Sequence, residues 1–303
     1  MKVVYSARYH VDIGPHVFPT LKYRMVHARL LETGVIHPAD VIEPSPASWD
    51  ELALVHTTEY LTKMRNGTLS PEDIAQLELP WSAEMVDGFR VMVGGTIQAA
   101  MIAAANLTRN PVVCHVGGGL HHAFRNHGEG FCPFNDVAVA VRVLQSRGVE
   151  RVAIVDLDVH HGNGTAFIFE SDNRVFTFSM HQQHNYPMWK PRGSLDIGLP
   201  DGTHDATFLR ALEDALPTVM ASRPECVFYL AGADPYEDDQ LGGLRLTKNG
   251  LRRRDRMVID AARAAGCPLV VTLAGGYARR VEDTIDIHVA TIEEAGHAAG
   301  SPQ

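Results

Sequence analysis

Short apolar runs rich in β-branched residues recur along this chain, and longer segments with a helical pattern separate them. The runs are residues 2–6, 111–116, 151–156, 174–180, 226–231 and 268–274. Strands of a parallel sheet have this composition, because helices cover both faces of such a sheet. The segments Val86–Ala105, Leu209–Met220 and Lys248–Ala265 have the periodicity of the helices that would cover it. The pattern therefore predicts an α/β fold with a largely parallel sheet.

No repeat, low-complexity tract or linker divides the 303 residues, so we expect a single domain over residues 1–303. Residues 298–303 are expected to form a frayed tail, and residues 66–80 a long loop. The formal net charge of −9 disfavours a nucleic-acid partner. The composition says nothing about the oligomeric state.

The cysteines and the N-terminus indicate a cytoplasmic location. The first residues, "MKVVYSARYH", lack the apolar stretch of a signal peptide, and no apolar segment reaches the length of a membrane span. The four cysteines are scattered and form no CxxC pair: Cys114, Cys132, Cys226 and Cys267. This spacing argues against a disulfide framework and against a zinc site made of thiolates.

Polar residues gather directly after five of the predicted strands. The segments are "GGGLHHAF", "LDVHHGNG", "MHQQHNYP", "GADPYEDD" and "GGYARR". In open parallel sheets, binding sites form at the carboxyl ends of the strands. We therefore expect these segments to build one site.

The stretch "VAIVDLDVHHGNGT" places two carboxylates and two imidazoles at a strand end. In an extended chain Asp156, Asp158 and His160 would share one face, and the carboxylates would repel each other without a cation between them. Imidazole with carboxylates suits Zn²⁺, and more loosely Fe²⁺ or Co²⁺. Asp234 in "LAGADP" is the best candidate for a third ligand. The alternative reading is that these aspartates cap a helix and a turn.

Two histidines and a tyrosine offer groups for proton transfer and oxyanion stabilisation. His121 and His122 follow the glycines of "HVGGGLHHA", and adjacent side chains are expected to point in different directions. That favours a proton-handling pair over two ligands of one metal. Tyr277 follows a glycine pair and can donate its hydroxyl to a developing oxyanion. The alternatives are surface histidines after a glycine turn and a tyrosine used only for packing.

These motifs resemble the histone deacetylase superfamily, which also includes acetylpolyamine amidohydrolases and acetoin-utilisation proteins. "GGGLHHA", "GEGFCPFND", "DLDVHHGNGT", "AGADPYEDDQLGGLRLT" and "LAGGY" occur in the order and spacing of that family, and the resemblance extends from about Ser6 to Ile292. "HVGGGLHHA", "AGADPYEDDQLGGL" and "SARYH" look most like the class IV enzymes and their bacterial relatives.

The resemblance implies an arginase/deacetylase-like three-layer fold with about eight strands. It implies one zinc ion per chain, and its ligands would be Asp158, His160 and Asp234. It makes His122 the general base and acid, with His121 as its electrostatic neighbour, and Tyr277 the group that polarises the scissile carbonyl. Asp156 would orient His121. A structural potassium ion would be held by Asp156, Ser179, Met180 and main-chain groups of Asp158 and His160. Gly130 and Phe131 would line one side of an acyl-lysine tunnel, and Tyr186 the other.

Two positions depart from the pattern of the class I enzymes. Asn163 stands where those enzymes orient the general base with an Asp, so here the contact to the imidazole is neutral. The rim Asp that grips the substrate backbone has no clear match, and Glu78 is only a stand-in for it.

The sequence thus predicts a zinc-dependent amidohydrolase that removes acetyl or longer fatty acyl groups from the lysine side chains of proteins or peptides. The class IV likeness favours a longer acyl group, with space left by "HVGGGL" and the loop after Met180. The nearest alternative is a deacetylase of acetylpolyamines or other small amides. An arginase-like ureohydrolase and a non-catalytic binding protein are weaker alternatives.

Overall fold

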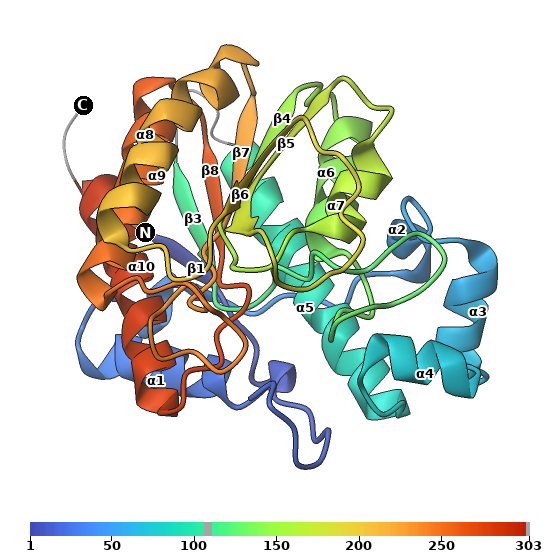
Figure 1. Ribbon diagram of the computed structural model, residues 1–303. Coiled ribbons are helices and arrows are strands. Elements are labelled where there is room, and N and C mark those ends of the chain that lie inside the picture. Colours follow the sequence, from blue (N-terminus) through green and yellow to red (C-terminus); the bar gives the residue numbers. More distant parts are fainter. Residues whose placement is uncertain (106–110, 301–303) are drawn as a thin grey trace.

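The computed structural model describes residues 1–105 and 111–300, and its centre is a sheet of eight strands that all run parallel (Figure 1). The strand order is β2-β1-β3-β8-β7-β4-β5-β6. The strands are β1 (Lys2–Val4), β2 (Val41–Ile42), β3 (Val112–His115), β4 (Val152–Asp156), β5 (Val175–Gln182), β6 (Leu195–Leu199), β7 (Cys226–Leu230) and β8 (Leu269–Thr272). The predicted α/β fold with a parallel sheet of about eight strands is confirmed.

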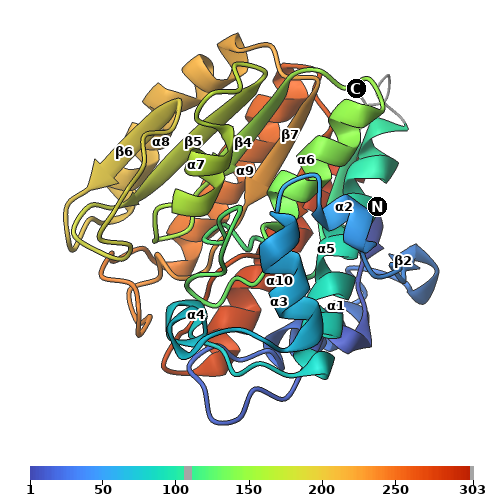
Figure 2. The same cartoon turned by 90° about the vertical axis from the view of Figure 1, so that its right-hand side faces the viewer.

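Helices cover both faces of the sheet, as Figures 1 and 2 show. One layer contains α1 (Lys22–Glu32), α8 (Asp205–Ala221), α9 (Lys248–Ala264) and α10 (Val281–Gly300). The other layer contains α5 (Ala83–Ala104), α6 (Asp136–Ser146) and α7 (Asn163–Phe169). Near this second layer lie α2 (Trp49–Leu52), α3 (Thr58–Asn66) and α4 (Pro71–Leu77), and two short 3-10 turns, η1 (Ala7–Tyr9) and η2 (Pro38–Asp40), complete the set. None of the helices in the described part of the chain is long and apolar enough to cross a bilayer.

The three helices predicted from periodicity are α5, α8 and α9, each within four residues of its predicted ends. Local residues explain where α5 and α9 begin. The side chains of Ser82 and Thr247 accept hydrogen bonds from backbone amides in the first turns of α5 and α9. The apolar strands β4, β7 and β8 are buried along their whole lengths, as expected for a sheet covered on both faces.

The expected long loop at residues 66–80 is wrong, because it contains α4. Ser70 caps this helix, Pro71 occupies its first turn and Asp73 completes the capping box, so local signals suffice to start it. At the other end of the chain, α10 continues to Gly300, through the first three residues of the segment expected to fray. Residues 301–303 lie outside the described residues.

Two strands escaped the sequence pattern for physical reasons. β2 has only two residues and both are partly exposed. β6 is an edge strand whose inner and outer residues alternate, so it has no continuous apolar run.

The sheet order explains how distant segments form one site. The carboxyl ends of β3, β8, β7, β4 and β5 are neighbours, with pairs such as His115 with Thr272 and Asp156 with both Leu230 and Ser179. The five polar segments therefore leave the sheet side by side, as the pattern predicted.

Candidate active site

Three buried side chains from two strand ends meet below the edge of the sheet. Asp158 and His160 lie in the turn after β4, and Asp234 lies after β7. The Nδ1 atom of His160 is 3.0 Å from Oδ1 of Asp158 and 3.3 Å from Oδ2 of Asp234. Among the described residues this is the one cluster of acidic, His or Cys side chains with the spacing of a metal site, its ligand atoms within 4.8 Å of one another.

Backbone amides fix the outer oxygens of both carboxylates. Gly275 N donates to Oδ2 of Asp158 at 2.8 Å, and Val159 N donates to Oδ1 of Asp234 at 2.9 Å. Oδ2 of Asp234 is buried and accepts no hydrogen bond. A Cβ at Gly275 would lie 2.0 Å from that same oxygen, so only glycine leaves the space open. An unsatisfied buried oxygen beside an imidazole and a second carboxylate fits a divalent cation.

The electrostatics of the two carboxylates agree with this fit. Burial and the neighbouring carboxylate of Asp158 raise the pKa of Asp234 above its usual value. Two buried carboxylates at this distance resist full ionisation, and a cation between them would relieve the repulsion.

The histidine pair is held by one partner at each outer nitrogen. Nδ1 of His121 is 2.7 Å from Oδ2 of Asp156, and Nδ1 of His122 is 2.7 Å from Oδ1 of Asn163. The expectation that the two rings diverge is wrong, because their Nε2 atoms are 3.1 Å apart. Two ring nitrogens at this separation can share a proton.

The two imidazoles differ in charge. Burial opposes ionisation of His121, but the carboxylates of Asp156 and Asp158 outweigh it and raise the pKa to about 9. Burial, together with the positive fields of His121 and His160, holds the pKa of His122 well below its usual range. His122 is therefore the neutral partner, as a general base must be.

Asp136 shapes the glycine-rich turn that carries this pair. Its carboxylate accepts from the backbone amides of Gly119 and Leu120 at 3.0 and 2.7 Å and from the Thr96 hydroxyl. Gly118 and Gly119 both have positive φ, +74° and +79°, which other residues rarely adopt. Sequence reasoning missed Asp136, although it ends the quoted motif "GEGFCPFND".

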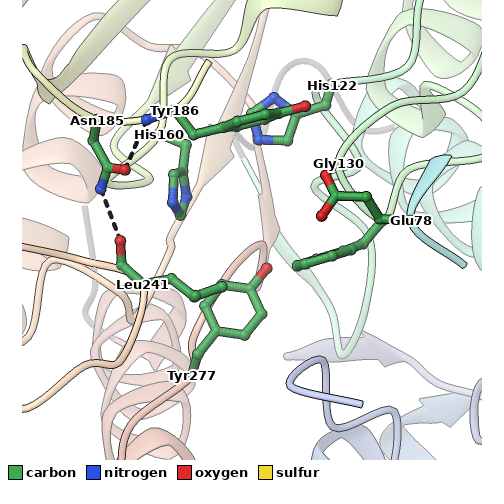
Figure 3. A pocket seen from close by; sticks show the side chains of 9 residues that line it. Glu78, His122, Gly130, His160, Asn185, Tyr186, Leu241 and Tyr277 are labelled. Atoms are coloured by element: carbon green, nitrogen blue, oxygen red, sulfur yellow. Dashed lines mark hydrogen bonds between the residues drawn. The ribbon is translucent and has the colours of Figure 1, made fainter. Parts of the chain in front are cut away.

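A cavity of about 170 Å³ opens above these groups (Figure 3). It is lined by Glu78, His122, Gly130, Phe131, His160, Asn185, Tyr186, Leu241 and Tyr277. The rings of His160, Tyr186 and Tyr277 surround the space in Figure 3. A Cβ at Gly130 would lie 2.8 Å from Cδ2 of His122, so glycine brings the wall close to the imidazole. The three predicted tunnel residues, Gly130, Phe131 and Tyr186, all lie here.

Tyr277 is aimed by a carboxylate that sequence reasoning also missed. Its backbone amide donates to Oδ2 of Asp239 at 2.7 Å, and Oδ1 of Asp239 accepts from the amides of Leu241 and Gly242. One side chain thus positions two walls of the cavity. Burial and the carboxylates of Asp158 and Asp234 raise the pKa of the Tyr277 phenol well above its usual value, so the hydroxyl stays a donor.

A fully buried arginine supports the loops that carry Asp158, His160 and Asp234. Nη1 of Arg254 donates to Gly232 O at 2.6 Å and to Leu157 O at 3.4 Å. Its Nε and Nη2 atoms donate to Asp255 at 2.9 and 2.8 Å. Arg254 lies in the charged run "RRRDR" of α9, which is typical of a solvent-exposed face, so sequence reasoning missed this buried residue.

The profile of the histone deacetylase domain matches residues 16–292. The chain belongs to the histone deacetylase family. An uncharacterised protein of Picosynechococcus is 44% identical over 94% of this chain and 95% of its own length. Histone deacetylase 2 of Arabidopsis thaliana is 31% identical over 94% of this chain and 78% of its own length. The crystal structure of a histone deacetylase homologue complexed with SAHA superimposes with a TM-score of 0.83, at 26% identity, over 98% of this chain and 84% of that one.

The chain is thus a hydrolase of the histone deacetylase family, whose members are typically metal-dependent. A second, smaller cavity of about 20 Å³ lies beyond it, between Phe18, Tyr23, Cys132 and Ala274. That volume holds about one water molecule. The remaining predicted potassium ligands are placed near the sheet end: Ser179 pairs with Asp156 across β4 and β5, and Met180 follows it, fully buried.

Proposed function

We propose that this protein is a zinc-dependent lysine deacetylase that hydrolyses the acetyl amide of lysine side chains. The observation that carries the proposal is the grouping of the Asp158–His160–Asp234 cluster, the histidine pair and Tyr277 at the inner end of one cavity. Zinc suits a site of one imidazole and two carboxylates.

A divalent metal held by the cluster would act as a Lewis acid and lower the pKa of a coordinated water. Nε2 of His122 accepts a proton from the attacking water, and the oxygen of that water bonds to the acetyl carbon. The Tyr277 hydroxyl donates a hydrogen bond to the carbonyl oxygen as negative charge develops on it. The carbon–nitrogen bond then breaks, and the protonated His122 returns the proton to the leaving lysine amine. The products are acetate and the unacetylated lysine side chain.

The walls of the cavity support a lysine side chain. Phe131, Leu241 and Tyr186 present apolar surface that suits the four methylenes of lysine. Glu78 stands at the rim, where its carboxylate can accept from a peptide amide or pair with a cation. The same carboxylate favours an acetylpolyamine as the second candidate substrate.

The size of the inner cavity supports a short acyl group. The expectation of a longer chain rested on space beside the glycines of "HVGGGL". Neighbours fill that space: a Cβ on Gly119 would lie 2.5 Å from Ala274, and one on Gly118 would lie 2.4 Å from Asp136. A cavity of about 20 Å³ does not accommodate several extra methylenes. Acetyl is therefore the proposed acyl group.

Three finer features of the protein are proposed from the motifs, the strand ends and the cysteines. The class IV likeness rests on the motifs "HVGGGLHHA" and "AGADPYEDDQLGGL". A structural potassium ion is proposed beside Asp156, Ser179 and Met180, where two strand ends adjoin. A cytoplasmic location is proposed because all four cysteines are free and buried.

The test is a substrate panel with the zinc-loaded protein. Peptides of one sequence would carry acetyl-, butyryl-, hexanoyl- or myristoyl-lysine, and N-acetylated polyamines would be run beside them. We expect the highest kcat/KM for acetyl-lysine peptide. Higher kcat/KM for an acetylpolyamine would favour the second candidate, and a rise with chain length would refute the short acyl group. A zinc-loaded protein that hydrolyses no member of the panel would overturn the proposal.

A further inference from the structure

Glu129 accepts a hydrogen bond from Tyr186, which lines the cavity, and it is the centre of a hydrogen-bond network that the proposed mechanism does not use. Its side chain is 14% exposed. It receives hydrogen bonds from Asn163 Nδ2 at 2.6 Å, Tyr186 OH at 3.0 Å, Gln76 Nε2 at 3.1 Å and His127 Nε2 at 3.4 Å. Burial alone would raise the pKa of this carboxyl, but these donors lower it, so Glu129 is ionised.

An ionised carboxylate accepts hydrogen bonds and donates none, which fixes the orientation of Asn163. The side of the Asn163 amide that faces Glu129 must be its NH₂ group. The carbonyl oxygen of the same amide then faces the other way, toward Nδ1 of His122 at 2.7 Å. The buried Asn163 cannot turn its amide over without opposing acceptor to acceptor on one side.

The orientation of Asn163 in turn determines which nitrogen of His122 carries the hydrogen. A carbonyl oxygen 2.7 Å from Nδ1 requires a hydrogen on that nitrogen. In the neutral imidazole the lone pair is then on Nε2, the nitrogen turned toward His121. That is the nitrogen that the proposed mechanism needs as a base.

The same oxygen of Glu129 also holds the tunnel wall. Oε1 accepts from both Asn163 and the Tyr186 hydroxyl, while the ring of Tyr186 packs edge-on against His122 with centroids 5.0 Å apart. The position of the wall and the tautomer of His122 therefore depend on one carboxylate.

We propose that Glu129 is a positioning residue that sets the tautomer of His122 through Asn163 and holds Tyr186 against the substrate. The inference rests on the proposed function. The contact between Asn163 and His122 is neutral, as the sequence predicted. The negative charge of Glu129, on the other side of Asn163, enforces the orientation of that contact.

The test exchanges the amide and the carboxylate between the two positions, since Glu and Gln, and Asn and Asp, are nearly equal in shape. Glu129→Gln removes the charge and allows Asn163 to turn over, so kcat should fall on the order of tenfold, the difference between a charged and a neutral hydrogen bond. Asn163→Asp places two carboxylates in contact and should lower kcat at least as much. In the double variant, Glu129→Gln with Asn163→Asp, the carboxylate is at position 163 and accepts from the amide at position 129. Its kcat should recover to within about threefold of the unchanged protein.

Gln76→Leu is the matched control, because it removes another donor to Glu129 and leaves Asn163 untouched. Its kcat should stay within about twofold, because this hydrogen bond is exposed and water can replace the lost donor. Tyr186→Phe should raise KM more than it lowers kcat, because it removes the hydrogen bond between this wall residue and Glu129 but leaves the Asn163 amide in place.

A second readout does not depend on turnover. The ¹⁵N shifts of the His122 ring in labelled, zinc-loaded protein report its tautomer. We expect hydrogen on Nδ1 in the unchanged protein and in the double variant, and a mixture in Glu129→Gln. Hydrogen on Nε2 in the unchanged protein would overturn the proposal, as would a double variant no more active than the weaker single variant. A protein inactive on all acyl-lysine peptides but with the expected shifts would refute the proposed function and leave the positioning role standing.

Discussion

Replacing Arg254 with methionine should destabilise the protein strongly, because it leaves a buried charge without its partner. Asp255 would keep its hydrogen bonds from Tyr229 and Thr291 but lose the guanidinium that neutralises it. Both side chains are almost fully buried, at 0% and 1% exposure, so water cannot take over that role. The carbonyls of Leu157 and Gly232 would lose a donor at the same time.

The expected loss can be worked out from these contacts. Removing one member of a buried ion pair costs about 3–5 kcal/mol. An unfolding entropy of about 2.1 cal/mol/K per residue gives about 0.6 kcal/mol/K for 303 residues, and thus a fall in Tm of about 5–8 °C. The metal-binding loops should also loosen, which we expect to weaken zinc binding by about 10–100-fold, as for other supporting contacts of metal ligands.

Urea unfolding of the zinc-free protein measures the ion pair apart from any stabilisation by metal. Arg256→Met is the control, since Arg256 lies on the same helix and pairs with Glu294 but is 57% exposed. That variant should lose less than about 1 kcal/mol. Arg254→Met with Asp255→Asn should recover part of the loss, because the unpaired charge is gone. A loss for Arg254→Met no larger than that for Arg256→Met would refute the reasoning.

Three further outcomes are expected. Tyr277→Phe should lower kcat by about 10²–10³ with zinc content and Tm unchanged, and a loss below about tenfold in steady-state kinetics would show that another group holds the carbonyl oxygen. Asp158→Ala and Asp234→Ala should each lose both bound zinc and activity, and elemental analysis that finds one zinc per chain in an active variant would contradict the cluster as the metal site. The hydrogen bond from Arg174 lowers the pKa of Asp172; burial opposes this effect, and a hydrogen bond from Arg142 adds to it. The ionised carboxylate therefore stabilises the fold above its unfolded pKa of about 3.9, and this stabilisation is lost as the pH falls. Asp172→Asn should therefore be destabilised at pH 7 and progressively less so as the pH falls below about 3.9 toward the lowered folded pKa, and an equal gap in unfolding free energy at pH 7 and pH 2 would exclude this origin.

The sequence predicted the parts of the fold that local pattern determines. Continuous apolar runs marked the buried strands, but β6 alternates and β2 is too short to be seen. The residues that are proposed to take part in the reaction lie in motifs at strand ends. Their supports, Asp136, Asp239, Glu129 and Arg254, did not stand out. The local sequence does not distinguish an Asp whose carboxylate accepts from a distant backbone amide from an Asp that is exposed to solvent. Only the tertiary contacts reveal that Asp136 and Asp239 support the site.

The place of β8 in the sheet has a consequence for how the chain is made. This strand is the last in sequence, yet it lies between β3 and β7 near the middle of the sheet. In the sheet order, the strands made before β8 fall into two separate blocks, β2-β1-β3 and β7-β4-β5-β6, and each block would have an unpaired edge until β8 is added. Synthesis must reach Thr272 before the blocks can join, and Tyr277 follows within five residues. Closure of the sheet and the arrival of Tyr277 at the cavity therefore belong to the same late step, and a chain cut short before β8 is exposed to aggregation at both edges.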